Sequence, residues 1–294
     1  MYFFCEKCFL RSFCFVEMSN SKKLVIKEFF QLKASEQKYW LEKINESDWS
    51  AGQYLFQLLS DEKFKQLCGQ KSQVFLLTHE DKLISFCTYA ERDDIPDSKL
   101  TPWIGFVYTF PAYRGKRRIG KLIEHIYRLA KNQGYEKLYI STDQKGLYEN
   151  FGFSFLQNAT DARGGQALVY QMKIEHKDYS DIIGQIVKGT IDRPLASAHP
   201  KHKDMIYPIN YGYVDGLFAG DGAEQDVYVF GSDKALKNFE GKVIGVYHRL
   251  NDVEDKWIVA LTTPNIAADK TYSDQEILDA IEFQEQYFMG ELYR

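Results

Sequence analysis

Residues 103–134, WIGFVYTFPAYRGKRRIGKLIEHIYRLAKNQG, combine a strand pattern, a basic loop and a helix pattern. The nearly unbroken apolar and aromatic run over 103–110 predicts a strand that is covered on both faces. Pro111 ends this strand because proline cannot donate to a strand ladder. From Gly120 onward the apolar residues recur at helical spacing, and Gly134 supplies a left-handed stop. The stretch therefore predicts strand, loop and helix in that order.

The loop between this strand and helix is rich in basic residues and contains two glycines. A strand that leads into a helix through such a loop directs unpaired backbone N–H groups, and the positive end of the helix dipole, at one point. That arrangement favours an anion such as a pyrophosphate, although a solvated basic turn is the alternative from the loop alone. The expected anion-binding residues are Arg114, Gly115, Lys116, Arg117, Arg118, Ile119 and Gly120.

A strand over Lys137–Thr142 and then Gly-Leu-Tyr148-Glu-Asn-Phe-Gly-Phe follow the helix. Together with the Tyr-Arg-Gly-x-Arg-x-x-Gly loop, this order resembles the GNAT (Gcn5-related) N-acetyltransferase family over residues 22–175. The resemblance implies an α/β fold with a mixed central sheet and flanking helices. It also implies acetyl-CoA as the cofactor and a small-molecule or peptide amine as the acceptor. Arg117 or Arg118 stands where the family's middle glycine is expected.

The family's chemistry, in which an amine attacks the thioester directly, implies three kinds of group. Backbone N–H groups at a bulge of the central strand, here Val107, Tyr108 and Thr109, would stabilise the oxyanion. Tyr148 would give a proton to the leaving thiolate, with a core aromatic as the alternative. Among the acidic residues Glu91, Asp93 and Asp94 at the end of the preceding strand, we take Glu91 and Asp94 as candidate bases. A solvated acidic loop is the alternative for each of them.

The chain changes character beyond a charged and polar stretch at 176–182, which we expect to be a linker. A segment dense in His, Lys and Pro leads to Tyr-Pro-Ile-Asn-Tyr-Gly-Tyr at 207–213 and Asp-Gly-Ala-Glu-Gln-Asp at 221–226. Carboxylates on a turn between strands suit Mg²⁺, and nearby basic side chains suit phosphate oxygens.

This second region resembles the family I (soluble) inorganic pyrophosphatases over about 182–257. The resemblance implies a second small domain, 183–294, with an OB-like β-barrel, a C-terminal helix and phosphate or pyrophosphate as its ligand. Asp192 would replace the first acidic residue. The implied phosphate-binding residues are Lys201, Lys203 and Tyr211, and the implied Mg²⁺ ligands are Asp221, Asp226 and Asp252.

Two departures from that family concern its hydrolytic chemistry. Ala223 stands where the family has the aspartate that activates water, and Asp252 and Asp255 are three apart instead of five. Because two-metal hydrolysis needs both ions placed correctly, these changes predict a weakly active or degenerate domain.

Composition agrees with two packed domains in 294 residues, since hydrophobic residues make up 45% and aromatic residues 15% of the chain. The net charge of −4 argues against nucleic-acid binding, and no apolar run reaches the roughly 20 residues that span a membrane. Five scattered cysteines indicate reduced thiols and a cytoplasmic protein. We expect residues 1–21 to be an N-terminal extension, with the native start at Met18 and the first 17 residues not native. The single Cys5–Cys8 pair does not predict zinc.

The remaining patterns predict a strand at 24–32, a helix at 36–44 capped by Ser35, a helix at 50–68, strands at 74–78, 83–90, 153–156, 167–174 and 185–191, and a helix at 273–288. We therefore expect an acetyl-CoA-dependent N-acetyltransferase fused to a pyrophosphatase-like domain. Two alternatives stay open. One is a sensor that binds CoA and a diphosphate ligand without turnover, and the other is a true Mg²⁺-dependent pyrophosphatase with an accessory GNAT domain.

Overall fold

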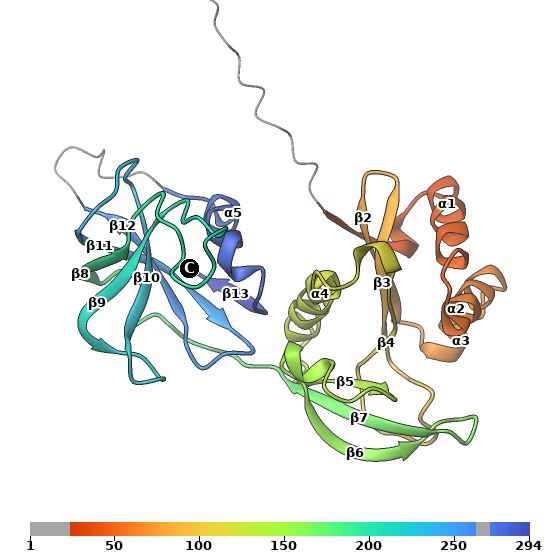
Figure 1. The fold of residues 1–294 in the computed structure, drawn as a ribbon. Helices are drawn as coiled ribbons and strands as arrows, with labels where there is room; N and C mark the ends of the chain where they lie inside the picture. Colours follow the sequence, from red (N-terminus) through yellow and green to blue (C-terminus); the bar gives the residue numbers. More distant parts are fainter. Residues whose placement is uncertain (1–23, 263–270) are drawn as a thin grey trace, which may run out of the picture.

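The computed structural model describes residues 24–262 and 271–294. The expected N-terminal extension, with Met18, Cys5, Cys8 and Cys14, lies outside the described residues. The described chain forms a half built on a mixed sheet and a half built on a β-barrel, which we call the sheet half and the barrel half (Figure 1).

The sheet half contains seven strands in the order β1-β2-β3-β4-β5-β7-β6. Its strands are β1 (Val25–Glu28), β2 (Gln73–His79), β3 (Lys82–Ala90), β4 (Trp103–Thr109), β5 (Lys137–Thr142), β6 (Ser154–Thr160) and β7 (Gln166–Lys173). Neighbouring strands are antiparallel except β4 and β5, which are parallel. The predicted mixed sheet is therefore confirmed.

Helices cover both faces of this sheet. They are α1 (Ala34–Asn45), α2 (Ser50–Ser60), α3 (Phe64–Cys68) and α4 (Arg118–Asn132), with short 3-10 segments η1 (Phe29–Gln31), η2 (Pro111–Tyr113) and η3 (Tyr148–Phe151). The apolar stripe of α4, including Leu122 and Ile126, is buried in one core with β2–β5, while Trp40 of α1 and Leu55 of α2 lie in the other core. Strand β4 is thus covered on both faces, as its apolar sequence predicted. Figure 1 shows α4 on the side of the sheet that faces the barrel half.

Several predicted boundaries of the sheet half were wrong. The helix expected at 50–68 is two helices, because Glu62 adopts a left-handed φ of 57° between them. Helix α4 begins at Arg118, before Gly120, and α1 begins after Lys33, so Ser35 is not its N-cap. Strand β1 ends at Glu28, whose carboxylate accepts a hydrogen bond from the Phe30 N–H and starts η1.

The barrel half contains six strands in the order β12-β10-β9-β8-β11-β13, and an additional β12–β11 pairing closes five of them into a barrel. The elements are β8 (Ile186–Arg193), β9 (Asn210–Phe218), β10 (Glu224–Phe230), β11 (Asn238–Arg249), β12 (Lys256–Leu261), α5 (Asp274–Glu285) and β13 (Gly290–Tyr293). A small barrel with a C-terminal helix was predicted and is present. Ser273 caps α5 through a capping box with Glu276, and β13, which was not predicted, follows the helix.

Helix α4 is also the main contact of the sheet half with the barrel half. Lys121 Nζ lies 2.8 Å from Glu282 Oε1, and Lys131 Nζ lies 2.6 Å from Glu291 Oε2. Met289, only 1% exposed, packs in the same core as the buried residues of α4 and η3. The two halves therefore share one apolar core at this contact.

Candidate functional site

The parallel strands β4 and β5 separate soon after they begin. They pair only at Trp103–Tyr139 and Ile104–Ile140, although both strands continue past these residues. Beyond Ile104, the backbone groups of β4 on this edge have no strand to bond. The separation leaves a split in the middle of the sheet, with backbone donors along one side.

Strand β4 is bulged next to this split, on its edge toward β3. Its register against β3 shifts between Thr88–Gly105 and Phe86–Tyr108, so that Phe106 and Val107 together oppose Cys87. Phe106 takes a left-handed φ of 47°, which a non-glycine residue rarely adopts and which accommodates the extra residue. The bulge was expected at 107–109 and lies one residue earlier, because Tyr108 and Thr109 pair again with β3.

The loop before α4 has an open helix start. Gly115 and Arg117 have φ values of 76° and 50°, and Arg117 supplies no side-chain cap to the helix. The first N–H groups of α4, at Arg118 and Ile119, are therefore available to an anion. A side chain on Gly115 would meet no atom within 4 Å, whereas one on Gly120 would lie 3.2 Å from the Phe151 ring. A side chain at position 120 would therefore require the Phe151 ring to move by a few tenths of an ångström.

The four basic side chains of the loop divide into two pairs. Arg114 Nε donates to the Thr109 carbonyl at 2.9 Å, and its guanidinium lies 3.4 Å from Asp48. Arg117 donates to the Asn150 carbonyl at 2.8 Å and its guanidinium lies 4.8 Å from the centre of the Phe151 ring. Lys116 and Arg118 form no hydrogen bond or ion pair with any described residue, so they remain free to neutralise a bound anion.

Tyr148 lies in the core that contains α4, close to the split. Its side chain is 6% exposed, and burial, with smaller contributions from Cys87, Asp143 and Asp93, raises the pKa of its phenol. No described residue hydrogen-bonds to its hydroxyl. A phenol with a raised pKa stays protonated at neutral pH, so the Tyr148 hydroxyl keeps a proton that it can donate.

The predicted bases occupy two different environments. Glu91 lies beside the loop after α3, where its Oε2 accepts from the Lys71 N–H at 3.2 Å. Asp93 and Asp94 lie beside Ser141 of β5, whose hydroxyl oxygen is 3.2 Å from Asp93 Oδ2 and 3.4 Å from Asp94 Oδ1. Burial is the main cause that raises the pKa of Asp93 to about 7, and the nearby Asp94 carboxylate adds to it. This pKa makes Asp93 the better candidate base.

The face of the split opposite α4 is aromatic and acidic. The half-exposed Tyr54 ring of α2 lies 6.3 Å from the ring of Phe106. Trp49 stacks on Tyr108 at 5.9 Å, and the Tyr108 hydroxyl donates to the exposed carboxylate of Asp48. An amine with an apolar body fits this lining, because aromatic faces attract both apolar groups and cations.

In the barrel half, the predicted metal ligands are already engaged within the protein. Asp226 accepts from the Tyr211 hydroxyl and from the buried ammonium of Lys256, which also lies 2.5 Å from Glu254. Asp252 pairs with Arg249 at 2.8 Å, and Asp221 accepts from the Ala223 N–H in its own turn.

The expected Mg²⁺ site is therefore not formed by these residues. Among 24–262 and 271–294, no three His, Cys, Asp or Glu side chains come close enough to hold a metal ion. Lys256 already supplies the positive charge between Asp226 and Glu254. Asp255 is directed elsewhere, toward His248 Nδ1 at 2.7 Å and the Tyr179 hydroxyl at 2.5 Å.

A second charged network in the barrel half begins at Arg249, the partner of Asp252. Arg249 is 3% exposed and makes two hydrogen bonds of 2.8 Å to the buried carboxylate of Glu285. The Tyr228 hydroxyl donates to the same carboxylate at 2.5 Å. These bonds satisfy a buried charge on α5 and fix the helix against the barrel.

The predicted phosphate-binding lysines lie on the loop between β8 and β9. Lys201 and Lys203 are exposed, and the rings of His199 and His202 lie 5.0 Å apart on the same loop. His199 stacks on Tyr207 at 6.2 Å, and Tyr207 lies 5.5 Å from the ring of Tyr211. The loop thus adds a basic surface next to Tyr211.

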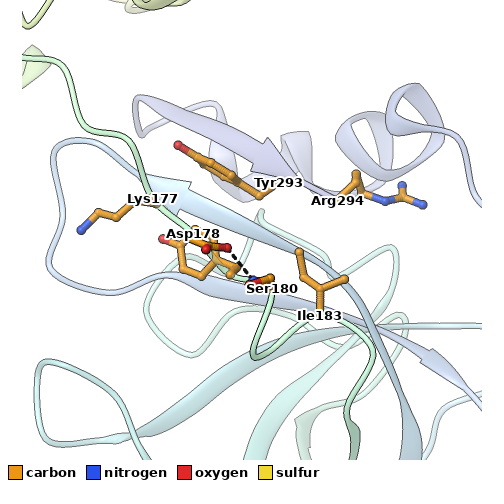
Figure 2. A pocket seen from close by; sticks show the side chains of 7 residues that line it. Lys177, Asp178, Ser180, Ile183, Tyr293 and Arg294 are labelled. Carbon is orange, nitrogen blue, oxygen red and sulfur yellow. Dashed lines mark hydrogen bonds between the residues drawn. The ribbon is translucent and has the colours of Figure 1, made fainter.

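A hollow of about 360 Å³ lies outside both of these places. Lys177, Asp178, Ser180 and Ile183 of the segment between β7 and β8 line it together with Tyr293 and Arg294 (Figure 2). The Asp178 carboxylate accepts from the Ser180 N–H at 2.9 Å within it. None of the predicted site residues lines this hollow.

The chain was compared with known families and structures. Residues 37–153 match the model of the acetyltransferase (GNAT) family. This part of the chain belongs to that family. The matched range contains the loop before α4 and Tyr148, which the sequence analysis assigned to the GNAT resemblance, and also the split that the structure shows. No curated protein matches the chain.

Solved structures are similar to each half of the chain. A GNAT family acetyltransferase from Elizabethkingia anophelis with acetyl-CoA bound is 16% identical, covering 51% of this chain and 97% of that one, with a TM-score of 0.37. An acyl-CoA N-acyltransferase from Pseudomonas aeruginosa is 16% identical over 51% and 98%, with a TM-score of 0.38. An inorganic pyrophosphatase from Neisseria gonorrhoeae is 22% identical over 37% and 81%, with a TM-score of 0.30.

The geometry of the GNAT domain adds Asp93 and Ser141 to the residues that the sequence selected. Asp93 stood in the same acidic run as Glu91 and Asp94, and nothing in that run distinguishes the three carboxylates. Only the fold places the Asp93 carboxylate beside Ser141 of β5. Phe106 was missed for a similar reason, because an aromatic residue in a strand gives no sign of a left-handed φ.

Proposed function

We propose that the GNAT domain is an N-acetyltransferase that moves the acetyl group of acetyl-CoA to a primary amine. The observation that supports this most strongly is the split between β4 and β5, with Tyr148 toward α4 and Asp93 by Ser141 on the opposite face. The family match supports the same reaction class. A thioester held in the split would be open to attack from one face and to protonation from the other.

In the proposed reaction the amine nitrogen attacks the thioester carbon from the face that Asp93 occupies. Asp93 takes the proton that the amine loses, and backbone N–H groups at the bulge of Phe106 and Val107 stabilise the oxyanion. The carbon–sulfur bond then breaks, and Tyr148 gives its proton to the CoA thiolate. The products are an acetamide and free CoA. The proton that Asp93 holds then passes through solvent to the Tyr148 phenolate, which restores the enzyme, so atoms and charges balance.

The loop before α4 is the proposed site of the coenzyme's pyrophosphate. The N–H groups of Arg118 and Ile119 would bond phosphate oxygens, and Lys116 and Arg118 would add charge. Arg114 and Arg117 would shape the loop, since both guanidinium groups contact carbonyl groups of the protein. The acceptor is proposed to be an amine on an apolar or aromatic body, because Tyr54 and Phe106 line the attacking face.

A thiol-release assay tests this function. The protein is mixed with acetyl-CoA and a panel of primary amines that ranges from aromatic amines to polyamines and peptides. We expect release of free CoA that requires the amine, in equal amount to the acetylated amine detected by mass spectrometry. Binding of acetyl-CoA without release from any amine would favour the sensor alternative.

For the barrel half we propose binding of a phosphate-type anion, without a part for Mg²⁺. Its basic loop, with Lys201 and Lys203 beside the Tyr207–Tyr211 contact, supports this second function. Calorimetric titration with inorganic phosphate and pyrophosphate, with and without a chelator, tests it. We expect binding that the chelator does not change. Mg²⁺-dependent release of phosphate from pyrophosphate, lost in Asp226→Asn, would instead show a working pyrophosphatase.

We propose domain limits of 22–175 and 183–294 with a linker at 176–182, since β7 ends at Lys173 and β8 begins at Ile186. We also propose a cytoplasmic location. Cys68 and Cys87 are free and buried, and burial raises the pKa of the Cys68 thiol to about 12. The described residues include no helix that is long and apolar enough to cross a membrane. Limited proteolysis and cell fractionation test the two proposals.

A further inference from the structure

The contact between the two halves lies directly behind the proposed coenzyme site. Three elements build that site, namely the loop before α4, the first turn of α4, and η3 with Tyr148. Barrel residues Leu250, Asn251 and Met289 touch these elements.

The side-chain amide of Asn251 joins both halves. Its Nδ2 donates to the Asn150 carbonyl at 3.0 Å, and its Oδ1 accepts from the Met289 N–H at 2.9 Å. The two bonds fix the orientation of the amide, because a reversed amide would place like groups together. The Asn150 carbonyl also accepts from Arg117 at 2.8 Å. One carbonyl of η3 therefore connects the coenzyme loop with the barrel half.

Met289 supports the first turn of α4. A Cβ on Gly120 would lie 3.7 Å from Met289 Sδ and 3.2 Å from the Phe151 ring, so these groups fill the space behind Gly120. The barrel also contacts the end of η3, where a Cβ on Gly152 would lie 3.2 Å from the Leu250 carbonyl oxygen. The barrel half thus contacts both the first turn of α4, through Met289, and the end of η3, through the Leu250 carbonyl.

Ion pairs hold α4 in this position. The side chains of Lys131 and Glu291 are 16% and 10% exposed, and the Tyr293 hydroxyl lies 2.6 Å from the same ammonium. The Lys121–Glu282 pair, which is more exposed, lies one residue after Gly120. The helix therefore has a bond to the barrel half near each end.

From these contacts we infer that the coenzyme site is shared between the two halves, and that Asn251 and Met289 are positioning residues for acetyl-CoA. Asn251 acts through the Asn150 carbonyl on Arg117, and Met289 acts through Gly120 and Phe151. The inference rests on the proposed acetyl-CoA binding. It also gives a physical reason for joining the two halves in one chain.

The test uses the full chain with Asn251→Asp, in which one carboxylate oxygen still accepts from the Met289 N–H while the other faces the Asn150 carbonyl. Calorimetry with acetyl-CoA should show a Kd about threefold to tenfold higher than in the wild type, because the hydrogen bond from Asn251 to the Asn150 carbonyl is lost. Met289→Ala should weaken binding in the same way. Asn238→Ala, an exposed asparagine of the same half at the start of β11, should bind like the wild type.

Steady-state kinetics separates positioning from general damage. In Asn251→Asp the KM for acetyl-CoA should rise, while kcat and the KM for the amine stay within about twofold of the wild type. Hydrogen exchange of residues 114–121 in the free protein should be faster in this variant, and this readout does not require the coenzyme. Wild-type affinity, kinetics and exchange in both Asn251→Asp and Met289→Ala would overturn the inference.

The same data distinguish this inference from the proposed function. If the wild type does not bind acetyl-CoA, the proposed function fails. Faster hydrogen exchange at 114–121 in Asn251→Asp would still show that Asn251 holds this loop in place. If the wild type binds and the variants bind equally well, only the shared site is refuted.

Discussion

The two halves differ in whether the polar groups of their candidate sites have partners inside the protein. In the sheet half, Lys116, Arg118 and the Tyr148 hydroxyl have no partner among the described residues. In the barrel half, Asp226 is paired with Lys256, and Arg249 is paired with Glu285. Groups without internal partners can bind a ligand without first breaking a bond in the protein. The difference indicates that the sheet half is arranged for chemistry, whereas much of the barrel's charge stabilises its own fold.

Helix α4 connects the two halves physically. One end of α4 presents open N–H groups to the proposed coenzyme, and its outer face makes ion pairs to the barrel half. Ion pairs with Glu282 and Glu291 of the barrel half thereby hold in place the helix whose first N–H groups would bind the coenzyme. Substitutions in the two halves test whether this difference holds.

The largest effect is expected for Tyr148→Phe. Removing the proposed proton donor should lower kcat by roughly 10²–10⁴, with little change in the KM for acetyl-CoA. Thiol release at saturating amine measures this loss. Tyr135→Phe, which removes a phenol packed against the same core outside the split, serves as the control. Equal rates for Tyr148→Phe and the control would show that the Tyr148 hydroxyl is only a core group.

Asp93→Asn should lower kcat over a similar range, roughly 10²–10⁴, because the proposed base is lost. In the wild type, kcat/KM should rise with pH through about 7 as Asp93 loses its proton, and this limb should disappear in the variant. A pH profile from 5 to 9 is the measurement, with Glu91→Gln as the matched variant that keeps the limb.

The contribution of Asp93 to folding stability should fall as pH rises, whereas kcat/KM should rise. The folded pKa of Asp93 is raised to about 7 from the ordinary value of 3.8, so the stabilisation by its protonated form is present below the unfolded value and is lost as pH rises through about 7. The Tm of Asp93→Asn should therefore exceed that of the wild type at pH 8 and approach it at pH 5. A lower Tm of Asp93→Asn than of the wild type at pH 8 would contradict the raised pKa of this carboxyl.

Arg249→Met should cost about 3–5 kcal/mol in the free energy of unfolding, because it leaves the buried Glu285 carboxylate without its cation. Urea unfolding measures this loss. The double variant with Glu285→Gln should recover most of it, since the uncompensated charge is then removed. A single variant as stable as the double would mean that the pair does not have the role we give it.

The sequence predicted much of this fold, and the reasons for its failures are local. The apolar run at 103–110, the basic loop and the periodic helix were sufficient to place the central strand and α4. Phe106 could not be recognised, because its left-handed φ is imposed by the bulge and by packing against α2. The base could not be selected either, since Glu91 and Asp93 differ only in which neighbours the fold gives them.

The barrel shows a different limit of sequence reasoning. Asp221, Asp226 and Asp252 have residue types and spacing that suit a metal, so their sequence favoured Mg²⁺. Their state depends on Lys256 and Arg249, which are close only in three dimensions and take the place of a cation. Pairs formed by strands that meet across a barrel cannot be derived from the order of charges along the chain.

A smaller effect is expected for the free cations of the coenzyme loop. Lys116→Ala and Arg118→Ala should each raise the KM for acetyl-CoA about fivefold to tenfold and leave kcat nearly unchanged, since they would contact only the pyrophosphate. Lys33→Ala, an exposed lysine just before α1, is the control. A kcat defect in either loop variant would place its side chain nearer the reaction than we propose.

The smallest effect is expected for Lys121→Ala at the contact between the halves. Its pair with Glu282 is solvent-exposed, with side chains 38% and 52% exposed, so the loss should be no more than about 1 kcal/mol of unfolding free energy. Lys131→Ala, at the more buried pair with Glu291, should cost more in the same urea titration. The reverse order would show that burial is not what sets the strength of this contact.

A crystal structure of the chain with acetyl-CoA bound tests the central claim most directly. We predict the pyrophosphate at the N–H groups of Arg118 and Ile119, the thioester in the split between β4 and β5, and the sulfur next to the Tyr148 hydroxyl. An empty split in crystals grown at saturating coenzyme, or a coenzyme bound with its sulfur away from Tyr148, would contradict the account.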